Sequence, residues 1–224
     1  MLKAVIFDMD GVIVDTEPLH RKAFFKMFED VGVDVDNTLY GSFTGKSTLA
    51  ICRDLCNHFH LSQTPETLMA LKRKYFRLYF KNDEGLALLD GVLALIKDYH
   101  HHGIKMVLAS SASMDNINRI FARFDLDKYF VAKLSGADLK DSKPHPEIFI
   151  KAAKASGHAA SECIVVEDAT NGIKAAKAAH IFCVGYQSAN SKNQDYSEAD
   201  LVISHFNEIE FTRISAIFQQ KRKN

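Results

Sequence analysis

The chain has 224 residues, of which 47% are hydrophobic and 25% are charged, and its 28 Lys and Arg residues balance its 28 Asp and Glu residues. This composition is typical of a globular domain and excludes a disordered chain. The zero net charge argues against a nucleic-acid-binding protein, and no apolar run approaches the roughly 20 residues that cross a bilayer. No signal peptide is recognisable, so we expect a cytoplasmic protein that binds neither nucleic acid nor membrane.

The N-terminal segment, residues 3–8, is short, β-branched and apolar, which predicts a buried strand. The apolar spacing that follows predicts helices over residues 19–31, 48–59 and 65–81. We therefore expect a helical cap domain at residues 15–87, inserted into an α/β core domain made of residues 1–14 and 88–224. Such insertions are tolerated because the ends of a surface loop lie close together.

From residue 91 onward, helical patterns alternate with short apolar runs. The predicted helices are residues 91–102, 115–124, 146–156 and 172–179. The predicted strands are residues 104–109, 163–166, 181–184 and 201–203. Strands that alternate with helices of about 10 residues indicate βαβ units and a parallel sheet. The predicted fold class is therefore α/β, a doubly wound, Rossmann-like parallel sheet with an inserted α-helical cap.

Polar residues follow three of the predicted strands, and a lysine stands in a nearby loop. The candidates at these positions are Asp8, Asp10, Gly11, Ser110, Ser111, Ala112, Ser113, Lys143, Glu167 and Asp168. The carboxyl ends of parallel strands share one edge of the sheet, where ligands bind, so we expect these residues to gather there. A buried cluster of acids is costly unless a cation neutralises it, and oxygen ligands favour Mg²⁺.

Asp8 and Asp10 are spaced for phosphoryl-transfer chemistry. Residues i and i+2 of an extended segment point to the same side, so one carboxylate can be a nucleophile and the other an acid/base. A carboxylate that attacks phosphorus gives an aspartyl phosphate. Mg²⁺ would bridge the attacking carboxylate and the phosphoryl oxygens, while Ser110 and Lys143 would bind the other oxygens.

Four motifs occur in order between residue 7 and about residue 185. They are FDMDGV (7–12) with DTEPLH (15–20), LASSAS (108–113), SKPHPEIF (142–149) and VEDATNGI (166–173). With this set the chain resembles the haloacid dehalogenase superfamily, in its β-phosphoglucomutase-like and phosphoglycolate phosphatase-like branch. A helical cap after the first strand also fits that family.

The resemblance implies roles for the core residues. Asp8 would be the nucleophile and a Mg²⁺ ligand. Asp10 would be the general acid/base, and its backbone carbonyl would also bind the metal. Ser110 would hydrogen-bond the transferring phosphoryl group, and Lys143 would neutralise it. An acid at position 10 favours phosphoryl transfer over carbon–halogen hydrolysis.

The same resemblance makes Asp168 a further Mg²⁺ ligand and Glu167 either a nearby ligand or an acid just outside the coordination sphere. Gly11 would permit a tight turn and close approach of the ligand. The candidate substrate-binding residues are Gly11, Glu17, His20, Lys46, Thr48, Lys74, Ser111, Ala112 and Ser113.

The cap residues bear on the choice of substrate. His20 and Lys74 match a histidine and a lysine of the sugar-phosphate mutases. However, Thr48 stands at the arginine position of those enzymes, and Met114 replaces a basic residue that contacts a second phosphate. Lys46 does not reproduce a bidentate arginine. A mutase must hold a bisphosphate at both ends, so we predict a phosphatase acting on a small phosphomonoester, with a sugar phosphate favoured. For a capped enzyme of this size we expect a monomer.

Other interpretations stay open at this point. A β-phosphoglucomutase-type mutase is the closest alternative, and a non-catalytic binding module of the same fold belongs to another class. Gly45-Lys46-Ser47 resembles the end of a nucleotide-binding P-loop, but the required earlier glycine is Tyr40, and Ser47 or Thr48 also suits a helix start. The four cysteines do not suggest disulfides, and Cys52, Cys56, His58 and His60 would crowd one helix end rather than surround zinc.

Overall fold

The computed structural model describes residues 1–43, 46–188 and 193–221, except for the side chain of Asp138, and it divides into two compact units. The larger, which we call the core unit, consists of Met1–Asp15 and Ala87–Asn224; the smaller, the cap unit, is Thr16–Leu86. Gly45, on which the P-loop comparison depends, and the basic tail residues Arg222 and Lys223 lie outside the described residues.

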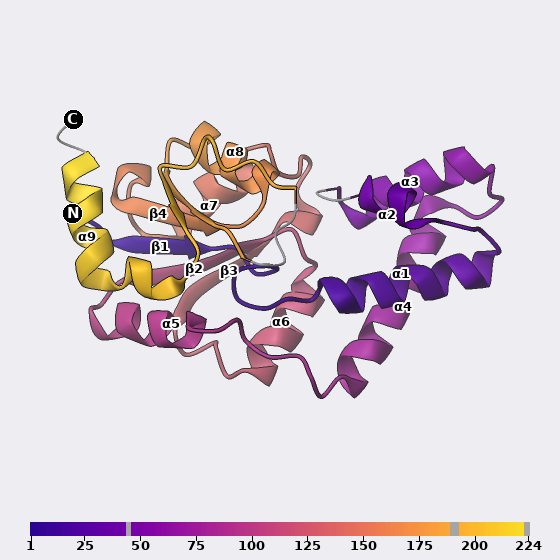
Figure 1. The fold of residues 1–224 in the computed structure, drawn as a ribbon, viewed down its shortest axis with the longest axis horizontal. Coiled ribbons are helices and arrows are strands. Elements are labelled where there is room, and N and C mark those ends of the chain that lie inside the picture. Colours follow the sequence, from indigo (N-terminus) through magenta and orange to yellow (C-terminus); the bar gives the residue numbers. More distant parts are fainter. Residues whose placement is uncertain (44–45, 189–192, 222–224) are drawn as a thin grey trace. The chain divides into compact units, whose positions relative to one another are not determined.

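The described part of the core unit contains a six-stranded parallel sheet in the order β3-β2-β1-β4-β5-β6 (Figure 1). The strands are β1 Ala4–Phe7, β2 Lys105–Ser110, β3 Phe130–Ser135, β4 Cys163–Glu167, β5 Phe182–Tyr186 and β6 Leu201–Ile203. The order reverses between β1 and β4, the place where doubly wound sheets bind ligands. The predicted fold class is confirmed.

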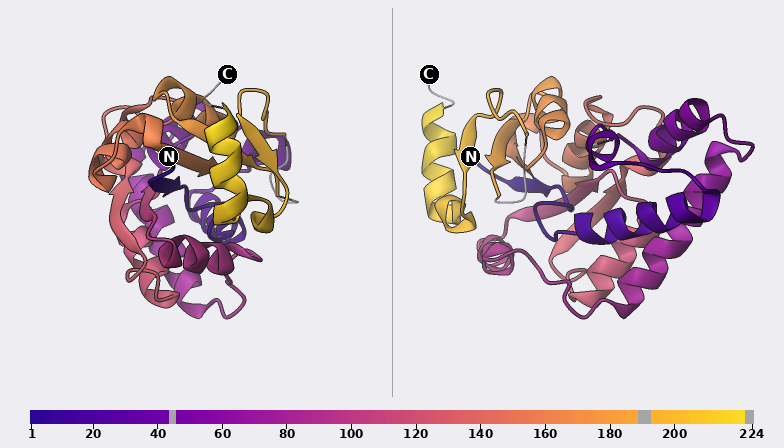
Figure 2. Two further views of the ribbon diagram at one scale, coloured as in Figure 1. Left: turned by 90° about the vertical axis from the view of Figure 1, so that its left-hand side faces the viewer. Right: turned by 45° about the vertical axis from the view of Figure 1, so that its right-hand side comes forward.

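Helices cover both faces of this sheet, as Figures 1 and 2 show. They are α5 Val92–His101, α6 Met114–Arg123, α7 Glu147–Ser156, α8 Thr170–Ala178 and α9 Phe211–Lys221, with short 3₁₀ turns at Gly136–Asp138, Ala160–Glu162 and Phe206–Ile209. The helices α7 and α8 pack on one face, and α5 and α6 pack on the other.

Successive side chains of the central strand β1 point to opposite faces of the sheet, so each face has apolar residues that a helix layer can cover. Ala4 and Ile6 are fully buried in the cluster that includes Phe149 of α7 and Ile173 of α8. The ring of Phe7 points to the opposite face, where its centroid lies 6.2 Å from that of Tyr99 in α5. A strand buried on both faces has no polar side to alternate with, so its sequence is a continuous apolar run.

The cap unit is helical in its described residues. Its helices are α1 Glu17–Val31, α2 Asn37–Gly41, α3 Thr48–Phe59 and α4 Pro65–Asn82. The start of α3 is fixed by Ser47, whose hydroxyl accepts from the Ala50 amide, and the start of α4 by Thr64. Apolar residues of α1, α3 and α4 form one core that includes the buried thiol of Cys52.

The structure differs from the sequence-based prediction in three elements. Strand β3 was not predicted, because it lies at the sheet edge with a partly exposed sequence that includes a lysine. The short helix α2 and the C-terminal helix α9, which extends to Lys221, were also not predicted. Helix α5 ends in a run of histidines at His101, and Gly103 follows with φ of 70°. Within the described residues, no helix combines the length and apolarity required for a membrane span.

Candidate active site

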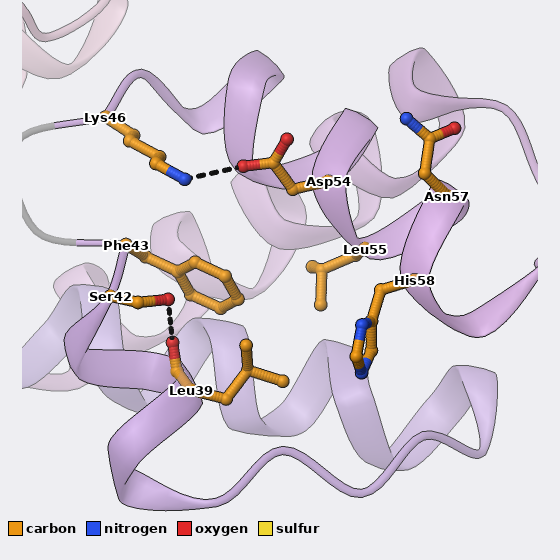
Figure 3. Close-up of a pocket in the computed structure, with 8 residues that line it drawn as sticks. All are labelled: Leu39, Ser42, Phe43, Lys46, Asp54, Leu55, Asn57 and His58. Carbon is orange, nitrogen blue, oxygen red and sulfur yellow. Dashed lines mark hydrogen bonds and ion pairs between the residues drawn. The ribbon is translucent and has the colours of Figure 1, made fainter.

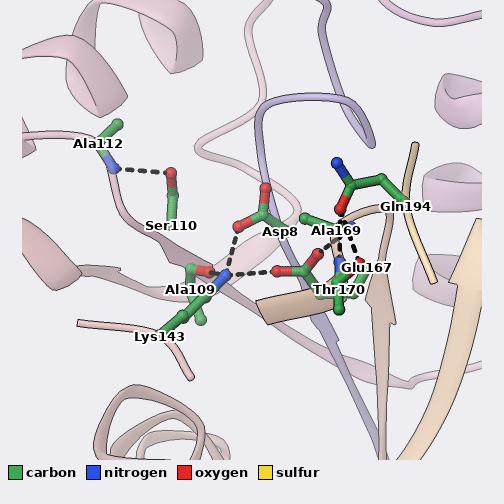
Figure 4. Close-up of polar contacts among 9 residues, drawn as sticks. All are labelled: Asp8, Ala109, Ser110, Ala112, Lys143, Glu167, Ala169, Thr170 and Gln194. Carbon is green, nitrogen blue, oxygen red and sulfur yellow. Dashed lines mark hydrogen bonds and ion pairs between the residues drawn. The ribbon is translucent and has the colours of Figure 1, made fainter. Parts of the chain in front are cut away.

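Lys143 lies at the centre of a buried ionic cluster at the carboxyl ends of β1 and β4 (Figure 4). Its Nζ donates to Asp8 Oδ1 at 2.5 Å, to Glu167 Oε1 at 2.7 Å and to the carbonyl oxygen of Ala109 at 3.1 Å. The side chains of Lys143, Asp8 and Glu167 are 7%, 9% and 2% exposed. An ammonium has three hydrogens to donate, so these contacts fix its position.

The sheet register brings the two acids together. Phe7 pairs with Val166, and the Asp8 amide continues the ladder by donating to the Val166 carbonyl at 3.0 Å. Asp8 and Glu167 therefore occupy neighbouring strand ends. Lys143 comes from the loop before α7, where its ammonium lies 4.7 Å from the ring centroid of Phe149.

The burial of this cluster changes the acidity of its members. Burial raises the pKa of Asp8 from 3.8 to about 7; attraction to Lys143 opposes this change, and repulsion from Glu167 adds to it. Burial alone would lower the pKa of Lys143, but the attraction of Asp8 and Glu167 outweighs it, so that pKa is raised above its ordinary value. Lys143 is therefore protonated at neutral pH and favours the ionised form of Asp8.

Ser110 ends β2 and is 1% exposed. Its hydroxyl oxygen accepts from the Ala112 amide at 3.1 Å, and the Ser135 hydroxyl donates to the Ala112 carbonyl at 2.7 Å. These bonds hold the turn that leads through the exposed Ser111 to Ser113, the residue before α6. The hydroxyl of Ser110 thus has a fixed place on the strand next to Asp8, because Phe7 pairs with Leu108.

Gly11 shows why glycine follows the two aspartates. Its φ is 86°, in the left-handed region, and a Cβ at this position would lie 2.1 Å from Asp168 Oδ2. The carboxylate of Asp168 therefore rests against the backbone of Gly11. Asp10, the preceding residue, is partly buried and forms an isolated bridge with Val14. The contact between Gly11 and Asp168 joins the loop after β1 to the loop after β4.

A second glycine shapes the loop after β4. Glu167 Oε2 accepts from the Ala169 amide at 2.9 Å. A Cβ on Gly172, in the first turn of α8, would lie 1.8 Å from Glu167 Oε1. The backbone of α8 can therefore pass directly over Glu167, whose two oxygens are held by Lys143 and by its own loop.

The cap unit contains a buried lysine that the sequence analysis missed. Lys72 is 2% exposed, and its ammonium contacts Nδ1 of His20 and lies 4.7 Å from the ring centroid of Phe24. His20 also stacks on Phe76, with centroids 4.4 Å apart. Burial, and then the charge of Lys72, hold the pKa of His20 well below its ordinary value of 6.5. An ammonium has no acceptor atom, so the contacted Nδ1 carries no proton.

The other cap candidates lie in different surroundings. Lys74 is exposed, and its ammonium lies 5.8 Å from the ring centroid of Tyr75. Glu17 accepts from the Tyr40 hydroxyl at 2.9 Å. The lysine beside His20 is thus Lys72, two residues before the one that the family resemblance suggested. The helical spacing of the sequence could have indicated that Lys72 is the buried lysine, because position 72 falls on the buried face of α4 with Leu68 and Phe76.

Lys46 and Thr48 lie at the start of α3. The Lys46 ammonium pairs with Asp54 Oδ2 at 2.7 Å. The side chains of Lys46 and Asp54 help to line a pocket of about 410 Å³ within the cap unit (Figure 3). Its other lining residues are Leu39, Ser42, Phe43, Leu55, Asn57 and His58. Thr48 is the first residue of α3, directly after the capping Ser47.

The comparisons with known proteins decide the family. Residues 2–180 match the family model described as haloacid dehalogenase-like hydrolase. The chain belongs to this family. The resemblance stated from the motifs is therefore confirmed, and so is the expectation that this haloacid dehalogenase-like protein is an enzyme, since its family is one of hydrolases.

Three similar proteins show the range of this family. The chain is 31% identical to fructose-1-phosphate phosphatase YqaB of Escherichia coli (strain K12), over 78% of this chain and 91% of that protein. It is also 31% identical to Protein SUPPRESSOR OF QUENCHING 1, chloroplastic, of Arabidopsis thaliana, over 85% of this chain but only 18% of that longer protein. The crystal structure of β-phosphoglucomutase (pgmB) from Clostridium difficile is similar with a TM-score of 0.85, 29% identity and 100% of each chain covered.

The donor atoms at this sheet edge fit a magnesium ion in their chemistry. Asp8, Asp10 and Asp168 offer oxygen ligands, which Mg²⁺ prefers, and the contact between Asp168 and Gly11 joins the two loops that carry them. As the side chains of the described residues stand, no three His, Cys, Asp or Glu groups are arranged around one metal position.

Proposed function

We propose that this haloacid dehalogenase-like hydrolase is a phosphatase that removes the phosphoryl group from a small phosphorylated metabolite, with a sugar phosphate as the favoured substrate. The observation that carries the proposal is the buried contact of Lys143 with Asp8 at the point where the strand order reverses. This arrangement combines a carboxylate with a fixed positive charge, as attack on a phosphoryl group requires. The relative named fructose-1-phosphate phosphatase supports the substrate class.

The first chemical step transfers the phosphoryl group to Asp8. A carboxylate oxygen of Asp8 forms a bond to phosphorus while the bond from phosphorus to the substrate oxygen breaks. Asp10 donates its proton to the leaving oxygen, which departs as the alcohol. Ser110 donates a hydrogen bond to the phosphoryl group, and the ammonium of Lys143 offsets its charge.

The second step restores the enzyme. Asp10, now ionised, accepts a proton from water, and the oxygen of that water attacks phosphorus. The bond between phosphorus and Asp8 breaks, which releases inorganic phosphate and returns Asp8 to its carboxylate form. Glu167 keeps Lys143 in place through both steps, since its Oε1 accepts a hydrogen bond from the ammonium that contacts Asp8.

We propose Asp8, Asp168 and the backbone carbonyl of Asp10 as the groups that would hold Mg²⁺. The ion would supply positive charge to the phosphoryl oxygens and to the attacking carboxylate. Glu167, whose oxygens are bonded to Lys143 and to the Ala169 amide, fits the role of an acid just outside the coordination sphere. The substrate-binding roles of Gly11, Glu17, His20, Lys46, Thr48, Lys74 and residues 111–113, the monomeric state and the cytoplasmic location stay predictions.

The test is release of inorganic phosphate from a panel of small phosphomonoesters with Mg²⁺. We expect turnover by the wild-type protein and none by Asp8→Asn, which keeps the shape of the side chain but removes the nucleophile. Asp115→Asn, at an exposed position on α6, is the matched control and should keep wild-type turnover. Equal turnover by Asp8→Asn and the wild type would contradict the proposal.

A phosphosugar mutase is the second candidate, because the similar solved structure at 29% identity is a β-phosphoglucomutase. The two functions differ in the fate of the phosphoryl group, which a mutase returns to another hydroxyl of the sugar. The decisive sample contains β-glucose 1-phosphate with a bisphosphate primer. Formation of glucose 6-phosphate without release of inorganic phosphate would favour the mutase.

A further inference from the structure

A short segment far along the chain is bonded to the loop that carries Asp168. We call residues 193–196 the strap. The hydroxyl of Tyr196, at its end, donates to the backbone carbonyl of Asp168 at 2.8 Å and lies 3.3 Å from the carbonyl oxygen of Tyr186. Asp168 and Tyr196 are 28 positions apart, so only the tertiary structure joins them.

Gln194 ties the strap to the next residues of the same loop (Figure 4). Its Oε1 accepts from the Thr170 amide at 2.8 Å and from the Thr170 hydroxyl at 3.0 Å. The Asp195 amide donates to that hydroxyl oxygen at 2.7 Å. Thr170 begins α8, and Ala169 before it has no side chain that can cap the helix. Gln194 therefore satisfies an amide at the helix start that would otherwise need a local cap.

The ring of Tyr196 is held against the sheet. Gly185 on β5 pairs with Glu167 on β4, and a Cβ on Gly185 would lie 2.8 Å from Cδ1 of Tyr196 and 3.2 Å from Cβ of Ala199. The absence of a side chain at this position lets the ring approach the strand. The phenol hydroxyl is thereby aimed at the Asp168 carbonyl by packing as well as by its hydrogen bonds.

We propose that Tyr196 and Gln194 are positioning residues that hold the Asp168 loop in the conformation required to bind Mg²⁺. Three consecutive residues of that loop are bonded: the Asp168 carbonyl to Tyr196, the Ala169 amide to Glu167, and Thr170 to Gln194. A ligand whose backbone is held in advance loses less conformational freedom when the ion binds, so its affinity for the ion is higher. This inference rests on the proposed function, which makes Asp168 a Mg²⁺ ligand.

The test compares Mg²⁺ binding by the wild type and by Tyr196→Phe, which removes the hydroxyl and keeps the ring over Gly185. Binding without substrate is measured as the Mg²⁺ concentration that half-saturates the protein, obtained by fitting the rise in melting temperature as Mg²⁺ is added. Activation is measured as the Mg²⁺ concentration that gives half-maximal turnover. We call these two concentrations the midpoints. We expect both midpoints to rise about 10-fold, in line with the effect of lost outer partners of metal ligands. Turnover at saturating Mg²⁺ should stay within about twofold of the wild type, because the chemical groups are intact.

Two further variants make the result specific. Gln194→Leu removes the acceptor for Thr170 and should also raise both midpoints. Tyr129→Phe is the matched control: its ring contacts His100 at a centroid distance of 5.3 Å, and its midpoints should equal those of the wild type. Unchanged midpoints in Tyr196→Phe and Gln194→Leu, in a wild type that does bind Mg²⁺, would overturn the inference alone. A wild type that shows no Mg²⁺-dependent stabilisation or turnover would instead overturn the proposed metal site.

Discussion

Among the described residues, each of the two units holds a lysine with a buried side chain, and these two lysines have different surroundings. In the core unit, Lys143 lies between the carboxylates of Asp8 and Glu167, which raise its pKa. In the cap unit, Lys72 lies against the imidazole of His20 and the faces of two phenylalanine rings. Burial lowers the pKa of that imidazole, and the charge of Lys72 lowers it further. A buried ammonium can thus stabilise a neighbouring anion, as Lys143 does for Asp8, or add to the effect of burial that keeps a neighbouring base neutral, as Lys72 does for His20.

The largest expected difference comes from removing each charge in turn. Lys143→Met leaves two buried carboxylates without their cation, so we expect a loss of about 3–5 kcal/mol in the free energy of unfolding at neutral pH and turnover below detection. Lys72→Met keeps an apolar chain among the rings and removes cation–π contacts, so we expect a loss of about 1–2 kcal/mol. Urea denaturation of both variants measures these values, and equal losses would contradict the comparison.

Glycines with positive φ give a second contrast between the units. Gly11 has φ of 86° with Asp168 Oδ2 only 2.1 Å from a would-be Cβ, whereas Gly32, after α1, has φ of 72° and nothing within 4 Å. Gly32→Ala adds only backbone strain, about 1–2 kcal/mol, and should leave turnover unchanged. Gly11→Ala adds the same strain and displaces Asp168, so we expect turnover to fall at least about 10-fold and the Mg²⁺ requirement to rise. Phosphate-release assays over a range of Mg²⁺ concentrations distinguish the two.

The low pKa of His20 predicts a dependence of stability on pH. In the unfolded chain His20 regains its ordinary pKa of 6.5, so the unfolded state binds more protons than the folded state just below that pH. The folded protein should therefore lose stability from this residue as the pH falls below about 6.5, and His20→Gln should remove that part of the loss. Melting temperatures of both proteins between pH 8 and pH 5 test this, and parallel curves would show that His20 is protonated equally in both states.

The smallest expected effect concerns Lys74. Because its side chain is exposed, Lys74→Gln should change the free energy of unfolding by less than about 0.5 kcal/mol. A rise in KM for the substrate at unchanged kcat would support the substrate-binding role that the family resemblance suggests. Unchanged KM together with a clear effect of Lys72→Met on KM would assign that role to Lys72.

The helices and strands that could be predicted from the sequence are those whose spacing of apolar residues matches the faces that are buried in the folded protein. The strand ending at Phe7 is a continuous apolar run because both its faces are covered. Helix α3 was predicted with its observed bounds, Thr48–Phe59, from apolar spacing, with Ser47 or Thr48 as the candidate start. Strand β3 was missed because an edge strand pairs on one side only and retains exposed residues such as Val131. Its stability comes from pairing with β2, which no local pattern displays.

At the candidate active site, too, some residues could be predicted from local sequence patterns and others could not. Asp8, Asp10, Ser110, Lys143 and Asp168 could be placed from the sequence because each stands in a motif at a strand end or in an adjoining loop, and parallel strands bring such positions to one edge. The strap could not be placed, because Tyr196 and Gln194 stand in no motif and meet Asp168 and Thr170 only in the tertiary structure, where β5 pairs with β4.

The sequence by itself thus determined the family and the α/β class, and it supplied the residues that we propose for phosphoryl transfer, since these depend on short apolar periods and on the order of chemical groups along the chain. Tertiary structure alone decided that Lys143 is held by both Asp8 and Glu167, and that Lys72 rather than Lys74 meets His20. The physical reason is that charge, burial and pKa depend on distances between segments far apart in the chain. Those distances are set by how the sheet and helices pack.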